Sequence, residues 1–168
     1  MKNYFAVILV IVAVFAGAII SETLREASVV DYTYNPSHNG FSRVDVKING
    51  TTVHLSDGCY GVSFDVTQDQ AYSIARGIEG TIGPRPLTHE IMKDILDNFG
   101  IKVAQVHIDR YENEIYYATI YMRRGDSALE LDARPSDSMA IASRMNVPVY
   151  FKTDILQENG VNECGVGA

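Results

Sequence analysis

The sequence predicts an α+β fold: a mixed, mostly antiparallel sheet with three to four helices, preceded by one N-terminal transmembrane helix. Two observations predict this fold class. Several short runs alternate apolar and polar residues, and runs with helical periodicity lie between them. A third observation, an uncharged apolar run from Tyr4 to Ile20, predicts the transmembrane helix. Hydrophobic residues make up 46% of the 168 residues, which is enough for one core.

The run from Tyr4 to Ile20 would form a helix roughly 26 Å long, close to the hydrocarbon thickness of about 30 Å. We favour an anchor that stays in the membrane, because the run is longer than a usual signal core. The alternative is a signal segment, residues 1–18, whose removal would make the protein secreted. Lys2 before the run, and Glu22 and Glu26 after it, predict an extracytoplasmic domain.

The chain divides into residues 1–20 as anchor or signal, 21–40 as linker, 41–160 as folded domain and 161–168 as a loose tail. Cys59 and Cys164 have no metal-ligand spacing, and we expect Cys59 to be buried and Cys164 to be a free tail thiol. A disulfide between them is the alternative if the domain lies outside the cytoplasm.

The folded domain begins with three predicted strands joined by two turns. Residues 42–48 alternate, the Asn49-Gly50 pair indicates a tight hairpin turn, and residues 51–55 follow as the second strand. The Asp57-Gly58 pair turns the chain into a third strand, residues 59–66. These features predict an antiparallel meander.

Two helices follow. Thr67 and Gln70 form a capping box that opens a helix ending near Ile78; its expected inner face is Ala71, Ile74, Ala75 and Ile78. Residues 79–86 contain two glycines and two prolines, which predicts a loop. Thr88 is expected to cap a second helix, residues 89–98, which Gly100 ends in a left-handed conformation.

The second half predicts a further meander and two more helices. Residues 101–109 alternate, with apolar and polar residues mixed on both faces, so we expect a strand partly covered on both sides. Strands at 115–123 and 128–133 follow it. Pro135 opens a third helix that Asn146 and Pro148 end. A last strand, residues 147–151, and a short helix, residues 153–160, complete the domain.

The composition removes several function classes. The chain has 14 Lys and Arg against 21 Asp and Glu, a net charge of −7, so its overall field does not attract nucleic acid. The sequence contains no phosphate loop, HExxH, CxxC or GxSxG motif. A phosphate would therefore have to bind at a local basic site.

Two helix starts carry candidate chemistry. Arg85 lies between two prolines just before a helix whose first turn contains His89 and Glu90, candidates for a general base or a metal ligand. The alternative is a rigid loop whose arginine pairs with an acid. Arg134 precedes the third helix, where a cation is unfavourable unless an anion joins it. That anion is either a neighbouring aspartate, Asp132 or Asp137, or a bound phosphate.

Four acids lie near these helix starts: Glu79, Glu90, Asp132 and Asp137. Carboxylates hold the divalent ion that many phosphodiesterases use, so these residues are candidate metal ligands if the two starts are adjacent. Scattered surface acids are the alternative explanation in a chain of this charge.

The segments GPRPLTHEIMKDIL, from Gly83, and LELDARPSDSMAIASRMNVPVYF, from Leu129, resemble the bifunctional nuclease domain family. The resemblance spans roughly residues 44–160 and implies a compact α+β fold, activity on DNA and RNA, and self-association. It carries over onto Glu79, Arg85, Pro86, Thr88, His89, Asp132, Arg134, Pro135, Ser136 and Asp137. One departure is Gln70, which lies near the position of an acid in the family pattern and raises the alternative of binding without cleavage.

We therefore predict a membrane-anchored nuclease that forms homo-oligomers and hydrolyses DNA, RNA or both. The predicted catalytic residues are His89, Asp137, Arg134 and Glu90. The predicted phosphate-binding residues are Arg85, Arg134, Thr88 and Ser136, and a Mg or Mn ion would be held by Asp132, Asp137 and Glu79. The alternative is a non-catalytic, self-associating adaptor on the same fold. In a third interpretation, the two motifs only stabilise the fold, and any activity lies elsewhere.

Overall fold

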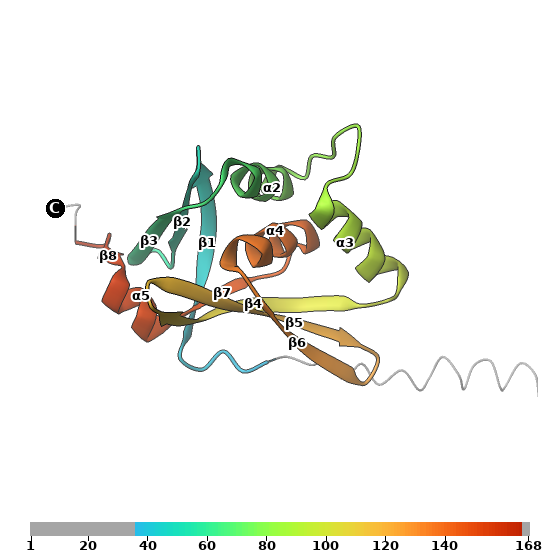
Figure 1. Ribbon diagram of the computed structural model, residues 1–168. Helices are drawn as coiled ribbons and strands as arrows, with labels where there is room; N and C mark the ends of the chain where they lie inside the picture. Colours follow the sequence, from blue (N-terminus) through green and yellow to red (C-terminus); the bar gives the residue numbers. More distant parts are fainter. Residues whose placement is uncertain (1–35, 166–168) are drawn as a thin grey trace, which may run out of the picture. The chain divides into compact units, whose positions relative to one another are not determined.

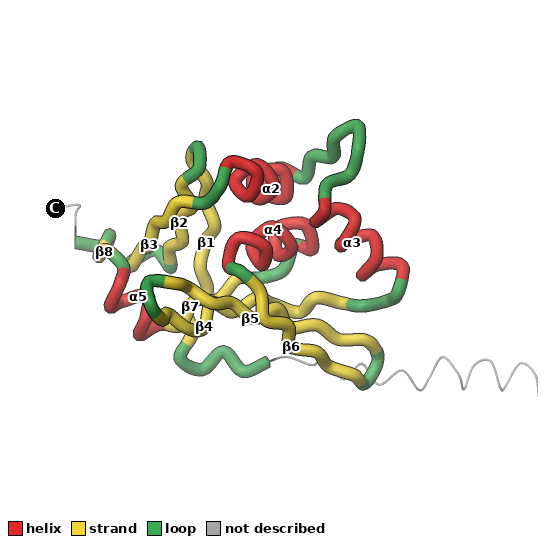
Figure 2. The backbone as a smooth tube through the Cα atoms, in the orientation of Figure 1, coloured by secondary structure: helices red, strands yellow, loops and turns green. Residues whose placement is uncertain are grey.

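The computed structural model describes residues 36–165, which form one eight-stranded sheet with helices against it (Figures 1 and 2). The strand order is β6-β5-β4-β7-β1-β2-β3-β8, and only β4 and β7 pair in parallel. The predicted α+β class with a mixed, mostly antiparallel sheet is confirmed. The elements are β1 Phe41–Asn49, β2 Thr52–Ser56, β3 Tyr60–Asp65, α2 Gln68–Glu79, α3 Thr88–Asn98, β4 Lys102–Glu112, β5 Ile115–Arg124, β6 Ser127–Ala133, α4 Pro135–Met145, β7 Val149–Lys152, α5 Thr153–Asn159 and β8 Val161–Asn162.

The predicted anchor at residues 4–20 lies outside the described residues. Among residues 36–165, no helix combines the length and apolar character needed to cross a bilayer. Part of the predicted linker, residues 36–40, packs on the domain: the His38 ring stacks on Tyr150 at 4.9 Å, and Gln105 Nε2 donates to the Pro36 carbonyl at 3.1 Å.

The first meander forms where the turn signals predict it, with one shift in position. Asn49 pairs with Thr52, so the two turn residues are Gly50 and Thr51. Gly50 has a φ of 61° and Thr51 does not have a positive φ, which places the glycine at the first central position of the turn. Glycine is favoured there because the left-handed region carries no steric cost for it.

Local capping explains how α2 and α4 begin. The Thr67 side chain accepts from Gln70 N, and Gln70 Oε1 accepts from Thr67 N, so the predicted capping box is confirmed. Pro135 occupies the first turn of α4, and Asn146 ends that helix with a φ of 52°. Both features follow the sequence prediction.

The start of α3 differs from the prediction. Thr88 is the first helical residue, and Leu87, whose side chain offers no acceptor, is the N-cap. The Glu90 carboxylate instead accepts from Leu87 N at 2.6 Å. The one-residue shift leaves His89 in the first turn of α3, as predicted.

The core centres on α4, which carries Met139, Ala140, Ile141 and Ala142 at 1% exposure or less. Helix α2 packs closely on it at Gly77, where an added Cβ would lie 3.0 Å from Ser143 Cβ. The inner face of α2 therefore includes Arg76 and Gly77, whereas Ile78, predicted to be inside, is 47% exposed.

The central strand β4 is covered on both faces, as its sequence predicts. Val106 and Ile108 alternate with Gln105 and His107, and all four side chains are buried. The His107 ring lies against Phe41 at 4.3 Å and Tyr121 at 4.7 Å between ring centroids. Burial, the largest cause, holds the pKa of His107 below its ordinary value.

Residues 161–164 are held against the domain, which corrects the prediction of a loose tail at these positions. Strand β8 pairs antiparallel with β3, and Cys164 forms a disulfide with Cys59. Cys59 is exposed, so the expectation of a buried thiol is wrong. Glu163 adds to the attachment, with its carboxylate 2.8 Å from Ser56 Oγ and 3.2 Å from His54 Nε2.

We expect reduction of the Cys59–Cys164 disulfide to lower the free energy of unfolding by about 2 to 4 kcal/mol. The bond closes a loop across 105 residues of sequence and so restricts the unfolded chain. Urea denaturation with and without reductant measures the difference. The Cys59→Ser, Cys164→Ser double variant is the control: it should match the reduced protein and show no response to reductant.

Candidate functional site

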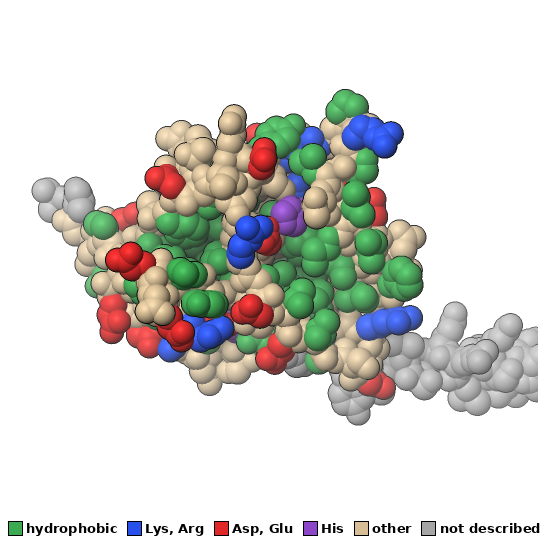
Figure 3. Space-filling model, in the orientation of Figure 1, with side chains coloured by type: hydrophobic (Ala, Val, Ile, Leu, Met, Phe, Trp, Pro, Cys, Tyr) green, Lys and Arg blue, Asp and Glu red, His purple; other side chains and the backbone are tan. Residues whose placement is uncertain are grey.

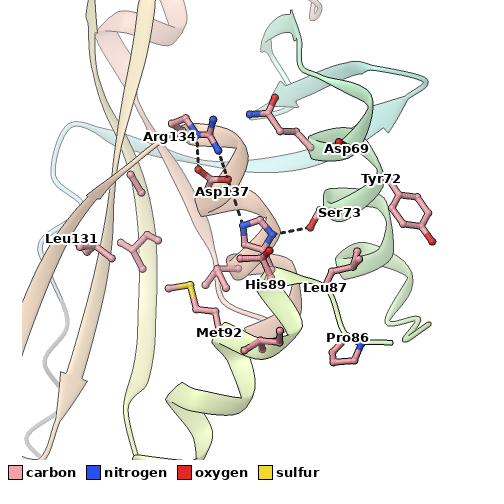
Figure 4. A pocket seen from close by; sticks show the side chains of 16 residues that line it. Asp69, Tyr72, Ser73, Pro86, Leu87, His89, Met92, Leu131, Arg134 and Asp137 are labelled. Carbon is pink, nitrogen blue, oxygen red and sulfur yellow. Dashed lines mark hydrogen bonds and ion pairs between the residues drawn. The ribbon is translucent and has the colours of Figure 1, made fainter. Parts of the chain in front are cut away.

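A cleft of about 780 Å³ opens where α2, the start of α3 and the start of α4 meet strands β5 and β6. Figure 4 shows His89, Asp137, Arg134 and Ser73 lying together on its walls, and Figure 3 shows a hollow with a histidine visible beside apolar side chains. The lining residues are Asp69, Gln70, Tyr72, Ser73, Pro86, Leu87, Thr88, His89, Ile91, Met92, Ile120, Leu131, Ala133, Arg134, Asp137 and Ile141.

The His89 imidazole lies between one polar partner from each neighbouring helix (Figure 4). Its Nδ1 is 2.8 Å from Ser73 Oγ on α2, and its Nε2 is 3.5 Å from Asp137 Oδ1 on α4. Three segments far apart in sequence therefore meet at one ring. The two sequence motifs meet in space through His89 and Asp137.

Arg134 and Asp137 form a bidentate ion pair at the cleft rim. Arg134 Nε is 2.6 Å from Asp137 Oδ2, and Nη2 is 3.1 Å from Oδ1. The spacing follows from local structure, because Arg134 is the N-cap of α4 and Asp137 lies in its first turn. The carboxylate also suits the positive end of the helix dipole. Arg134 has a side chain that is 69% exposed, so its other N–H groups face solvent.

The environment keeps His89 neutral at pH 7. Burial, the largest cause, lowers the pKa of His89, and the charge of Arg144 lowers it further, while Asp137 partly opposes both. The Asp137 carboxylate favours the tautomer with the proton on Nε2. The Nδ1 lone pair of His89 then accepts a hydrogen bond from the Ser73 hydroxyl, so the basic nitrogen faces Ser73.

Glu90 is adjacent to His89 in sequence but is not part of the cleft. It is 6% exposed, and its Oε1 lies 2.8 Å from Arg144 Nη2 and 3.7 Å from Arg76 Nε. Burial alone would raise the pKa of Glu90, but the hydrogen bonds from Arg144 and from the Leu87 N–H hold it below its usual value. Glu90 therefore belongs to a buried ionic cluster that joins α2, α3 and α4.

The other predicted site residues are dispersed. Thr88 lines the cleft, whereas Arg85 is exposed on the loop before α3 and does not line it. Glu79 is exposed at the end of α2, and Ser136 is buried in α4. Asp132 lies on β6, where its carboxylate is 3.6 Å from Arg110 Nη2.

The predicted metal ligands are not assembled. Within residues 36–165 there is no group of three or more His, Cys, Asp or Glu side chains placed to hold an ion. Of the predicted set Glu79, Asp132 and Asp137, only Asp137 lines the cleft, and both its oxygens face Arg134. These residues do not fit a resident divalent ion.

Ser73 is the site residue that the sequence reasoning missed. It lies three residues after Gln70, so both side chains project from the same side of α2 into the cleft. The sequence did carry one signal for Ser73, because it is a polar residue on the inner face of a helix. Gln70 Oε1 is already occupied by the Thr67 N–H of the capping box.

The fold and the cleft define a class: an α+β domain in which a neutral histidine, a carboxylate and an exposed arginine meet at the starts of two helices. The chain belongs to the bifunctional nuclease domain family, whose model matches residues 56–163.

Relatives lie in bacteria and plants. An uncharacterized protein of Mycobacterium tuberculosis is 34% identical over 96 residues, which cover 57% of each chain. Bifunctional nuclease 2 of Arabidopsis thaliana is 31% identical over 86 residues, and bifunctional nuclease 1 of Oryza sativa subsp. indica is 30% identical over 81. These two matches cover 49% and 46% of this chain but only 26% and 24% of the plant proteins.

Proposed function

We propose that this protein is a nuclease that hydrolyses phosphodiester bonds of DNA or RNA in the cleft between α2, α3 and α4. One observation carries the proposal: a neutral His89, held between Ser73 and Asp137, lies beside an exposed Arg134 in an open cleft. Family membership and the names of the plant relatives support it.

In this mechanism Arg134 binds the phosphate and His89 moves the proton. A phosphate entering the cleft pairs with the N–H groups of Arg134 that Asp137 leaves free. His89, neutral at pH 7, accepts the proton of the attacking oxygen through Nδ1. Asp137 faces the opposite nitrogen and stabilises the imidazolium that forms. The same imidazolium then protonates the leaving oxygen.

The direct test uses the purified full-length chain with end-labelled single-stranded DNA and RNA. Magnesium, manganese or a chelator is present in separate reactions, which also reports whether an added ion contributes. A His89→Asn preparation, made in parallel, reveals contaminating nuclease. Cleavage by the wild-type chain alone supports the proposal. A folded protein that cleaves neither substrate under any condition removes it.

The cleavage rate should rise with pH and level off, with an apparent pKa lower than that of a free histidine. The general base works only as neutral imidazole, and burial lowers the pKa of His89 from 6.5. The folded protein should also lose stability as pH falls through this region, since the unfolded histidine binds its proton more readily. A pH–rate profile and melting curves at each pH measure both effects.

We propose that the domain is anchored in the membrane by residues 4–20 and lies outside the cytoplasm. The Cys59–Cys164 disulfide supports the location, because such bonds persist mainly in oxidising compartments. Adding protease to intact cells tests it: an outside domain is digested without lysis, and a domain protected until lysis contradicts the proposal.

We also propose that the domain self-associates through the exposed apolar residues of α3 and β6. Ile91 and Ile95 on α3 and Phe99, the C-cap of that helix, follow one another at four-residue intervals. Leu129 is exposed on the edge strand β6. Figure 3 shows apolar side chains gathered over this side of the domain. Such a patch favours a protein partner.

Replacing Ile95 by lysine should shift the protein to monomer, because a charge in an apolar interface is desolvated without a partner. Sedimentation velocity of the chain in detergent measures the change. Asn98→Lys places the same charge at a polar position of α3 and should leave the assembly intact. A wild-type chain that is already monomeric at high concentration contradicts the proposed interface.

A non-catalytic binding module is the second candidate. The observation that favours it is Gln70, which lines the cleft near the position of an acid in the family pattern and is tied to the capping box. Comparing the wild-type chain with Arg134→Ala distinguishes the two candidates. If both bind nucleic acid and neither cleaves it, the result favours the binding module. If the wild-type chain cleaves nucleic acid and the variant cleaves it more slowly, the result favours the nuclease.

A further inference from the structure

We propose that Ser73 is the nucleophile of the reaction, so that cleavage proceeds through a covalent phosphoserine diester. The inference rests on the proposed nuclease function and names the attacking group. Ser73, His89 and Asp137 form one chain of contacts, with Ser73 Oγ 2.8 Å from Nδ1 and Asp137 Oδ1 3.5 Å from Nε2. A nucleophile, its base and a third group that orients the base are the arrangement that activates a hydroxyl.

The tautomer of His89 identifies the hydroxyl that it can deprotonate. With the Asp137 carboxylate 3.5 Å from Nε2, we assign the ring proton to Nε2, which leaves Nδ1 as the basic nitrogen, 2.8 Å from the Ser73 hydroxyl oxygen. A water molecule would have to displace that contact to reach the base. The proton nearest to the base is therefore the proton of Ser73.

The position of Ser73 within α2 supports the same role. A serine inside a helix commonly donates to the carbonyl four residues before it, as the partly buried Ser143 does to Met139 in α4 at 2.8 Å. Ser73 instead bonds to a side chain from another helix while lining an open cleft. It is 6% exposed, which limits the access of bulk water to the oxygen.

The chemistry balances in two displacements. Ser73 Oγ attacks the phosphorus, its proton passes to His89 Nδ1, and the bond from phosphorus to the leaving sugar oxygen breaks as that oxygen takes the proton. Water then attacks the phosphoserine diester and gives its proton to His89. The bond from phosphorus to Ser73 Oγ breaks, and the serine oxygen recovers a proton.

The first test is independent of nucleic acid. The full-length chain is treated with diisopropyl fluorophosphate, which transfers its phosphoryl group to activated serines and releases fluoride. Mass spectrometry should find the modification on Ser73 in the wild-type chain, strongly reduced in His89→Asn, with Ser143 as the unmodified internal control. A native protein that shows no modification at Ser73 overturns the proposal, even when cleavage of nucleic acid is observed.

The second test reads the stereochemistry of cleavage with a chiral phosphorothioate substrate in ¹⁸O water. Two displacements give retention at phosphorus, whereas direct attack by water gives inversion and overturns the proposal. Ser73→Ala should lower kcat by about 10³-fold or more, and Ser143→Ala should leave it unchanged. Ser73→Ala activity within tenfold of wild type assigns Ser73 no more than a positioning role. If Ser73 is labelled but the protein cleaves no nucleic acid, the proposed nuclease function fails while the inference of an activated Ser73 stands.

Discussion

Replacing His89 by asparagine is expected to lower kcat for nucleic-acid cleavage by about 10²- to 10⁴-fold, the contribution of a positioned general base. Asparagine keeps a polar side chain that can still meet Ser73 or Asp137, but it cannot accept a proton at neutral pH. KM should change little, because phosphate binding is assigned to Arg134. Initial rates over a range of substrate concentrations measure both constants.

His54 supplies the matched control for this substitution. It also contacts a serine and a carboxylate, with Nδ1 2.9 Å from Ser63 Oγ and Nε2 3.2 Å from Glu163 Oε1, but it lies on β2 and does not line the cleft. His54→Asn should leave kcat unchanged. Equal losses in both variants would mean that the effect comes from general destabilisation. A His89→Asn chain that retains full kcat contradicts the assigned role.

Replacing Glu90 by glutamine is expected to lower the free energy of unfolding by about 3 to 5 kcal/mol. The substitution leaves Arg76 and Arg144 buried without their counter-charge, although glutamine can still accept from the Leu87 N–H. The Nε atoms of both arginines are already buried without a hydrogen-bond partner, so little local compensation is available. Urea denaturation at neutral pH measures the loss.

The exposed Glu79 at the end of α2 provides the comparison, and Glu79→Gln should change stability by no more than about 0.5 kcal/mol. Adding Arg144→Met to Glu90→Gln should recover part of the loss, because it removes one uncompensated charge. If Glu90→Gln is as stable as the wild-type chain, the cluster does not hold the three helices together.

Much of the fold was predictable because its signals are local. The Asn49-Gly50 and Asp57-Gly58 turns, the Thr67–Gln70 capping box and Pro135 each act within a few residues. The errors came from interactions between distant segments. The pairing of β8 with β3 and the disulfide that fixes it involve positions about a hundred residues apart, and no periodicity in a two-residue strand reveals them.

The candidate site was predictable in part, for a geometric reason. Consecutive helical residues point about 100° apart, so His89 and Glu90 project in different directions, although neighbours such as Thr88 and His89 can both line one cleft. Nothing in the sequence shows which of them faces Asp137 and which faces the buried Arg76 and Arg144. Ser73 was missed because its partner lies on another helix.

The covalent bond that ties β3 to the C-terminal segment closes most of the domain into a ring. Every peptide bond between positions 59 and 164 lies inside that ring, including the exposed loop before α3. A single proteolytic nick there would leave two pieces still joined through sulfur, with the helices α2 and α4 on either side of the cut. Severing the backbone once would not by itself release a fragment, because the two pieces stay joined through the Cys59–Cys164 disulfide.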